Sequence, residues 1–239
     1  MNPLQFRWSR ESINWLLDAS AYTGFHSKLA EQIAPYLEPD ATLCDIGCGL
    51  GRLGLELAPY VSRLTAIDID SRVIARLKQD AALQNLKNLH AICADAATLN
   101  ERFDIVLMSF FGKHGKSIEV YYPFCRRKLI CIVNAANKSS LYPGHYRQTI
   151  KDTIPSVQKD LTDQGRGFKL IVDSFEFGQP LRSRRDGEKF IFHQAPEASP
   201  EEISDFLREN AIPTGRDDFP LYLPNMKEIG IFVIDMNGD

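Results

Sequence analysis

Residues 43–51 of this chain read Leu-Cys-Asp-Ile-Gly-Cys-Gly-Leu-Gly, an apolar run that ends in an acidic residue and continues into three alternating glycines. The apolar run is typical of a buried strand. Glycines let the backbone bend sharply and approach a bound molecule closely, and Asp45 adds a negative charge beside the turn. This segment therefore predicts a ligand-binding turn at the end of a strand in an α/β sheet.

Strand-like and helix-like segments alternate along the rest of the chain, which predicts helices on both faces of a parallel sheet. Strands are expected at residues 41–46, 62–68, 89–94, 103–109, 128–134, 168–177 and 228–236. Helices are expected at residues 9–19, 26–37, 52–59, 71–84, 117–126 and 147–163. The predicted fold class is α/β, with a doubly wound, mostly parallel seven-stranded sheet.

The 239 residues are predicted to form one domain. Its parts are an N-terminal helical lid (1–38), a ligand-binding core (39–177), an insertion (178–227) and the last strand (228–239). The insertion contains six prolines and two helix signals, at residues 184–193 and 199–209. It is a candidate cap over the substrate.

Composition excludes some classes of function. A formal net charge of -3 argues against a dedicated nucleic-acid binder, which is usually basic overall. Residues 1–8 lack the apolar region of a signal peptide, and no stretch approaches the roughly 20 apolar residues that cross a bilayer. We therefore expect a cytoplasmic protein without a membrane span. The cysteine spacing lacks the second pair of ligands typical of a metal site.

A competing motif overlaps the turn, because residues 49–54 match the G-x-G-x-x-G pattern of NAD-binding folds. The first glycine of that pattern should follow the strand directly, but residues 45–48 intervene. Asp45 would also repel a pyrophosphate, whereas it suits a ligand with a positive group.

An acid followed by G-x-G-x-G resembles the first motif of the class I S-adenosylmethionine-dependent methyltransferases. The resemblance extends to Asp68 at the end of the second strand, to Asp95 after the third, and to residues 103–109 as the fourth strand. It covers roughly residues 26–135. It implies that S-adenosyl-L-methionine is the cofactor.

The resemblance also implies which residues hold the cofactor. The turn would bind the methionine part, with Asp45 ordering the turn or acting through water. Asp68 would accept hydrogen bonds from both ribose hydroxyls, and Ile69 would pack on adenine. Asp95 would accept from the adenine amino group, and the amide of Ala96 would donate to a ring nitrogen. The expected set is Asp45, Gly47, Cys48, Gly49, Gly51, Asp68, Ile69, Asp95, Ala96 and Ser109.

Acceptor contacts are expected at the carboxyl ends of the strands, including the loop after the fourth strand. This loop lacks the Asn/Asp-Pro-Pro-Tyr/Phe motif of methyltransferases that act on amino groups of adenine, cytosine or glutamine. Its basic residues suit an anionic substrate, and Arg182, Arg184 and Arg185 add positive charge in the insertion. His114 and Tyr121 are the candidate general bases. Candidate substrate contacts are Tyr22, Phe25, His26, Phe110 and Lys113.

The predicted function is methyl transfer to a small molecule, with the acceptor atom left open. Methylation of RNA or protein is the second hypothesis. The further hypotheses are a non-catalytic cofactor-binding module and an NAD-dependent oxidoreductase. The sequence makes no prediction of oligomeric state.

Overall fold

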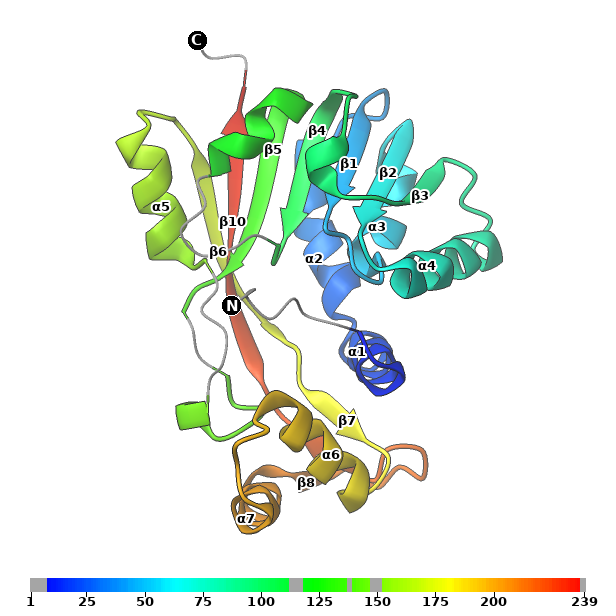
Figure 1. The fold of residues 1–239 in the computed structure, drawn as a ribbon, viewed down its shortest axis with the longest axis vertical. Coiled ribbons are helices and arrows are strands. Elements are labelled where there is room, and N and C mark those ends of the chain that lie inside the picture. The colour runs from blue at the N-terminus through cyan, green and yellow to red at the C-terminus, as the bar shows by residue number, and fades with distance from the viewer. Residues whose placement is uncertain (1–7, 112–117, 137–138, 147–151, 237–239) are drawn as a thin grey trace.

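The centre of the fold is a seven-stranded sheet with the strand order β3-β2-β1-β4-β5-β10-β6. A computed structural model describes residues 8–111, 118–136, 139–146 and 152–236. The strands are β1 (Thr42–Ile46), β2 (Arg63–Asp68), β3 (Leu89–Cys93), β4 (Phe103–Ser109), β5 (Cys125–Asn134), β6 (Lys169–Glu176) and β10 (Met226–Asp235). Strands β1 to β5 are parallel, and β10 is antiparallel to both β5 and β6 (Figure 1). The predicted doubly wound, mostly parallel seven-stranded sheet is confirmed.

Helices cover both faces of this sheet. On one face pack α2 (Phe25–Ile33), α3 (Arg52–Leu57) and α4 (Ser71–Leu83), and on the other a 3₁₀ helix (Ile118–Phe124) and α5 (Ile154–Asp163). Because side chains alternate along a strand, β4 supplies both layers: Ile105 and Leu107 face one, and Val106 and Met108 face the other.

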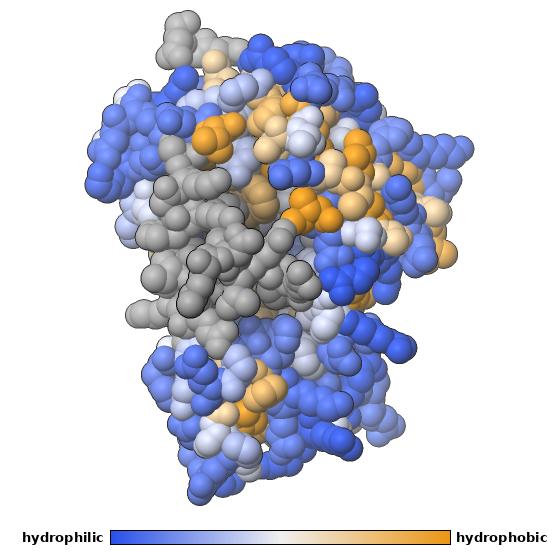
Figure 2. All heavy atoms as spheres, viewed as in Figure 1, coloured by the Kyte–Doolittle hydropathy of each residue, from blue (hydrophilic) through white to orange (hydrophobic). Residues whose placement is uncertain are grey.

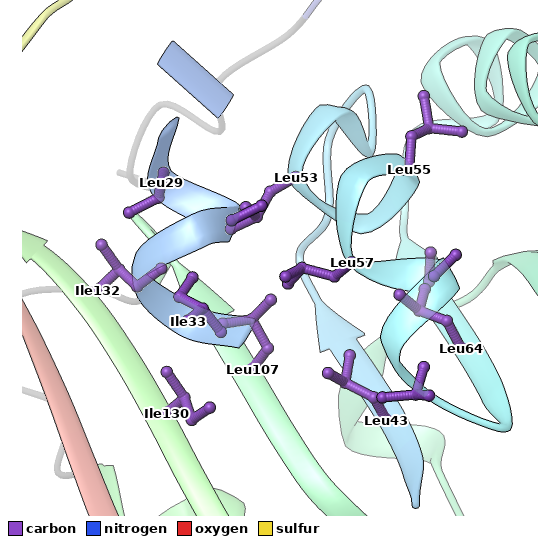
Figure 3. Packing of buried hydrophobic residues seen from close by; sticks show 14 of the residues in the cluster. Leu29, Ile33, Leu43, Leu53, Leu55, Leu57, Leu64, Leu107, Ile130 and Ile132 are labelled. Carbon is purple, nitrogen blue, oxygen red and sulfur yellow. The ribbon is translucent and has the colours of Figure 1, made fainter. Parts of the chain in front are cut away.

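Figure 3 shows the core between α2, α3 and the sheet. Leu29 and Ile33 of α2 lie close to Leu107, Ile130 and Ile132 of the central strands. All five side chains are fully buried. Burial of one such side chain contributes about 1.5 to 3 kcal/mol, so this layer fixes the position of the sheet beneath the glycine turn.

The insertion forms a second, smaller structure. Three short strands, β7 (Gln179–Leu181), β9 (Leu221–Leu223) and β8 (Ile212–Pro213), pair in that order. They pack with α6 (Arg184–Gln194) and α7 (Pro200–Asn210), and Trp15 of α1 (Arg10–Thr23) joins their apolar cluster. In Figure 1 this part lies below the large sheet, on the side to which the parallel strands point, with α1 between them.

Two predicted helices differ from those observed. Residues 118–124 form a 3₁₀ helix and not the α-helix expected over 117–126, since Pro123 lies inside it and lacks a backbone N–H. In the span 147–163, α5 begins at Ile154, where Thr153 and Ser156 form a capping box. Residues 147–151 lie outside the described part of the chain.

The small sheet was not predicted, whereas both helices of the insertion were. Gly187 weakens the helical pattern of α6, but a Cβ there would lie 2.8 Å from Leu181 and 2.9 Å from Leu207. The glycine allows α6 to approach both side chains closely, so tertiary packing outweighs its poor helix propensity.

Figure 2 shows hydrophobic side chains gathered on the upper part of this face and a smaller group below, among mostly hydrophilic side chains. Across the residues that the structure describes, no helix has the length and apolar character required to span a membrane.

Candidate functional site

The glycine turn leaves β1 and crosses to α3 in a conformation that other residues rarely adopt. Gly47, Gly49 and Gly51 have φ angles of +69°, +53° and +61°. The amides of Gly47 and Cys48 both donate to the carbonyl of Ile67, at 2.8 and 3.0 Å. The turn is therefore tied to the end of the neighbouring strand β2.

Asp68 closes β2 and holds the middle of this turn. One carboxylate oxygen accepts from the amide of Gly49 at 2.9 Å, and the other accepts from the amide of Asp70 at 2.9 Å. A carboxylate has about four acceptor positions, so each oxygen retains capacity for one more hydrogen bond. Ile69, the next residue, is 51 % exposed and presents apolar surface beside the carboxylate.

Asp45 lies beneath the turn and does not face its surface. The residue is 2 % exposed, and its Oδ1 has no hydrogen-bond partner. Burial raises its pKa to about 7, and the charge of Asp68 adds to the increase. In the structure Asp45 therefore lies under the turn and does not reach its surface.

Two aromatic rings cover the turn. A Cβ on Gly47 would lie 2.0 Å from the ring of Phe111, and one on Gly49 would lie 3.1 Å from the ring of Trp8. The pKa of Asp70 is lowered mainly by its hydrogen bond with Arg72 and in part by one from the backbone of Trp8. Trp8 is thus held across the ends of β1 and β2.

Asp95 and Ala96 begin a 3₁₀ turn (Ala96–Thr98) after β3. The Asp95 side chain accepts from the amide of Ala97 at 2.9 Å and therefore caps this turn. The amide of Ala96, at the first position, has no acceptor within the turn. Ser109 ends β4 in the same row of strand ends.

Past Ser109 lies an aromatic cluster around an ammonium group. Lys227 Nζ is 3.6 Å from the ring centre of Phe110, 5.4 Å from that of Phe25 and 5.2 Å from that of Phe177. Phe110 has a φ of +51°, which is uncommon for a bulky residue and recurs at functional sites. The structure thus brings two predicted substrate contacts, Phe25 and Phe110, together.

His26 joins this cluster through Phe25 and Phe177, at 5.0 and 5.7 Å between ring centres. Its Nδ1 lies 2.8 Å from Ser20 Oγ. Burial lowers the pKa of His26 to about 3, and the positive charge of Lys227 contributes. His26 is therefore neutral at pH 7.

Tyr22, a further predicted substrate contact, packs against other aromatic rings. Its ring stacks on Tyr222 at 4.9 Å and meets the edge of Phe219 at 6.0 Å. Gly24, with a left-handed φ of +65°, turns the chain between α1 and α2, so Tyr22 and Phe25 point to different surroundings. Tyr22 attaches α1 to the small sheet and is better described as a packing residue.

Of the two candidate general bases, Tyr121 lies in the described part of the chain. The ring centre of Tyr121 lies 6.1 Å from that of Phe111. Burial raises the pKa of Tyr121, which disfavours the phenolate that a base requires. His114 and the predicted substrate contact Lys113 lie outside the described residues.

Sequence reasoning did not assign Phe111, Phe177 or Lys227 to the site. The pair Phe110-Phe111 directly after a strand end is the one local signal for the first. Phe177 directly follows β6 and Lys227 lies in β10, far along the chain, and no spacing in the sequence connects them with Phe110.

Comparison with known proteins adds an independent observation. A family model described as a methyltransferase domain matches residues 43–122, which contain the turn, Asp68 and Asp95. Nodulation protein S of Sinorhizobium fredii is 29 % identical over 97 residues, which cover 40 % of this chain and 44 % of that protein. The chain thus spans less than half the length of this curated relative.

Solved structures share the fold over most of the chain. A protein of Bacillus halodurans C-125, itself only provisionally assigned as a methyltransferase, matches with a TM-score of 0.58 and 13 % identity, covering 87 % of this chain and 97 % of that one. Magnesium protoporphyrin IX methyltransferase of Synechocystis, solved with S-adenosylhomocysteine, matches with a TM-score of 0.51 and 15 % identity over 95 % of this chain and 89 % of that one. Residues 43–122 therefore match a methyltransferase domain, and the chain has the fold of the class I S-adenosylmethionine-dependent methyltransferases.

Proposed function

We propose that this protein binds S-adenosyl-L-methionine and transfers its methyl group to a small molecule. The observation that carries the proposal is the turn of three left-handed glycines clamped to Asp68, which retains acceptor capacity on both carboxylate oxygens. The methyltransferase domain that matches residues 43–122 supports it.

The residues present fit this cofactor. Backbone without side chains at Gly47 and Gly49 suits the methionine part, and Asp68 suits a ribose with two hydroxyls. Exposed Ile69 offers apolar surface to adenine, and the amide of Ala96 offers a hydrogen-bond donor to a ring nitrogen. Buried Asp45 supports the turn from below.

The cofactor would supply a methyl group activated by a sulfonium, so the protein's contribution is chiefly alignment. Holding an acceptor at about 3 to 3.5 Å from the methyl carbon supplies several kcal/mol of the barrier. Phe111 and Trp8, which cover the turn, would keep water from this region. The raised pKa of Tyr121 and the lowered pKa of His26 favour alignment over base catalysis by these two groups.

The basic residues of the insertion are less suited to gripping an anion than their sequence suggests. Arg182 pairs with Asp18 at 2.7 Å, and Arg184 donates to Ser204 Oγ at 2.8 Å. Two of the arginines that favoured an anionic acceptor or an RNA are thus already engaged. This favours a small molecule over the second hypothesis, an RNA substrate.

The test is calorimetric titration with S-adenosylhomocysteine and with NAD. Hydrogen bonds to a charged group contribute about 1.5 to 3 kcal/mol, so Asp68→Asn should weaken binding of the nucleoside by about tenfold or more. Asp217→Asn, the same change at an exposed position away from the turn, is the matched control. Its affinity should stay close to that of the wild type.

Binding of NAD without binding of S-adenosylhomocysteine would overturn the proposed cofactor. For the RNA hypothesis, binding to a generic RNA is measured between 50 and 200 mM salt. A steep loss of affinity with salt would favour RNA as the substrate, because phosphate contacts release counterions.

A further inference from the structure

A cavity of about 170 Å³ lies between α1, the start of β7 and α6. Four aromatic rings line it: Trp8, Trp15, Phe177 and Phe190. It adjoins the glycine turn through Trp8, whose ring also packs on Gly49. It adjoins the aromatic cluster through Phe177, which stacks on Phe25 at 4.3 Å.

We propose that this cavity is the acceptor site and that the acceptor is a neutral molecule built on a single aromatic ring. The inference rests on the proposed methyl transfer and names the substrate class that the sequence left open.

The lining excludes a charged acceptor. It contains no Asp, Glu, Lys or Arg side chain among the described residues. His193 is the one titratable side chain among the described lining residues, and burial lowers the pKa of His193, which keeps it neutral at pH 7. A charged ligand would lose hydration here without gaining a charged partner, whereas a neutral ring gains from burial.

The walls are rigid and suited to a flat molecule. Trp15 meets Phe190 edge to face, at 5.3 Å and 84°. The indole nitrogen of Trp15 donates to Asp186 at 2.9 Å, and its carbonyl accepts from Gln179 at 3.2 Å. Aromatic walls favour edge-to-face and offset contacts with another ring.

The volume limits the size of the acceptor. An apolar cavity of about 150 Å³ holds one benzene molecule. A volume of about 170 Å³ therefore accommodates one ring with a small substituent.

In the reaction, a nucleophilic atom on the ring or its substituent forms a bond to the methyl carbon. The carbon–sulfur bond of the cofactor breaks, and its electron pair stays on sulfur. The proton displaced from the acceptor leaves to solvent. S-adenosylhomocysteine and the methylated aromatic are the products.

Intrinsic fluorescence tests the inference directly, because the chain has two tryptophans and both line the cavity. The wild type saturated with S-adenosylhomocysteine is titrated with phenol, with benzoate, and with cyclohexanol. These are similar in size and differ in charge or aromaticity. Phenol should give a saturable change, and the other two should bind at least about tenfold more weakly, or 1.4 kcal/mol. Trp8→Phe then assigns the signal to one indole.

Ala19→Leu fills the cavity from α1, and Leu16→Phe does so from the same helix should the first variant fail to fold. Ala82→Leu makes the same change at an exposed helical position and is the matched control. The filled variants should lose phenol binding at least about tenfold and keep the calorimetric affinity for S-adenosylhomocysteine.

Equal binding of benzoate and phenol, or unchanged phenol binding in the filled variants, overturns the inference about the cavity while the proposed function stands. Phenol binding by a protein that does not bind S-adenosylhomocysteine overturns the acceptor role together with the proposed function.

Discussion

Asp45→Asn tests whether the buried acid beneath the turn is a source of instability. Burial raises the pKa of Asp45 to about 7 from an ordinary 3.8, with Asp68 as the second cause. A group whose pKa is higher in the folded than in the unfolded chain stabilises the fold at low pH, and this stability is lost as pH rises through about 7. Asparagine has nearly the same shape and does not ionise.

The magnitude follows from the shift. A difference of about three pKa units corresponds to about 4 kcal/mol in total, of which about 2 to 3 kcal/mol falls between pH 5 and pH 8. Between pH 5 and pH 8, the free energy of unfolding of the wild type should therefore fall by about 2 to 3 kcal/mol more than that of Asp45→Asn. The buried amide lowers the variant's stability by about 1 to 3 kcal/mol, and that loss does not depend on pH.

The assay is urea unfolding at pH 5 and pH 8, with the free energy extrapolated to water. Asp217→Asn, at an exposed position, is the control and should follow the wild type. All other titrating groups are shared, so they cancel in the difference between the proteins. Parallel pH dependence of the wild type and Asp45→Asn would refute the argument that an unpartnered, buried carboxylate strains this turn.

Two further predictions concern His26 and Gly51. Burial lowers the pKa of His26 to about 3, so the wild type loses stability as pH falls from about 6.5 towards 3, and His26→Gln should unfold at a lower pH when followed by circular dichroism. Gly51→Ala should lower the free energy of unfolding by about 2 kcal/mol or more, because it combines a φ of +61° with a Cβ placed 2.5 Å from Leu77. Gly165→Ala is its control, with a φ of +67° and no atom within 4 Å, and should cost only about 1 kcal/mol in thermal unfolding; equal losses would show that contact with Leu77 is unimportant.

The large sheet could be predicted because its strands carry their own signals. The central strands β1, β2, β4 and β5 contain apolar runs, and burial between two layers of helices requires such runs. The helix over 117–126 could not be predicted correctly because its apolar spacing outweighed Pro123. The small sheet was missed because strands of two or three residues have no period, and Leu181 pairs with Leu221 forty residues away.

Part of the candidate site could likewise be predicted from the sequence, and part could not. The glycine turn and Asp68 could be found because their geometry depends on residues near each other in β1, β2 and the turn. Phe177 and Lys227 could not be found, because the packing of β6 and β10 brings them to Phe110 from distant parts of the chain.

The sequence by itself determined the sheet and the turn, since glycine conformation and strand burial are properties of short segments. Only the tertiary structure decided the charge state of Asp45 and the character of the cavity. Both depend on what surrounds a group: burial removes the water that would stabilise a charge, and the walls at Trp15 and Phe190 exist only after α1 and α6 have packed together.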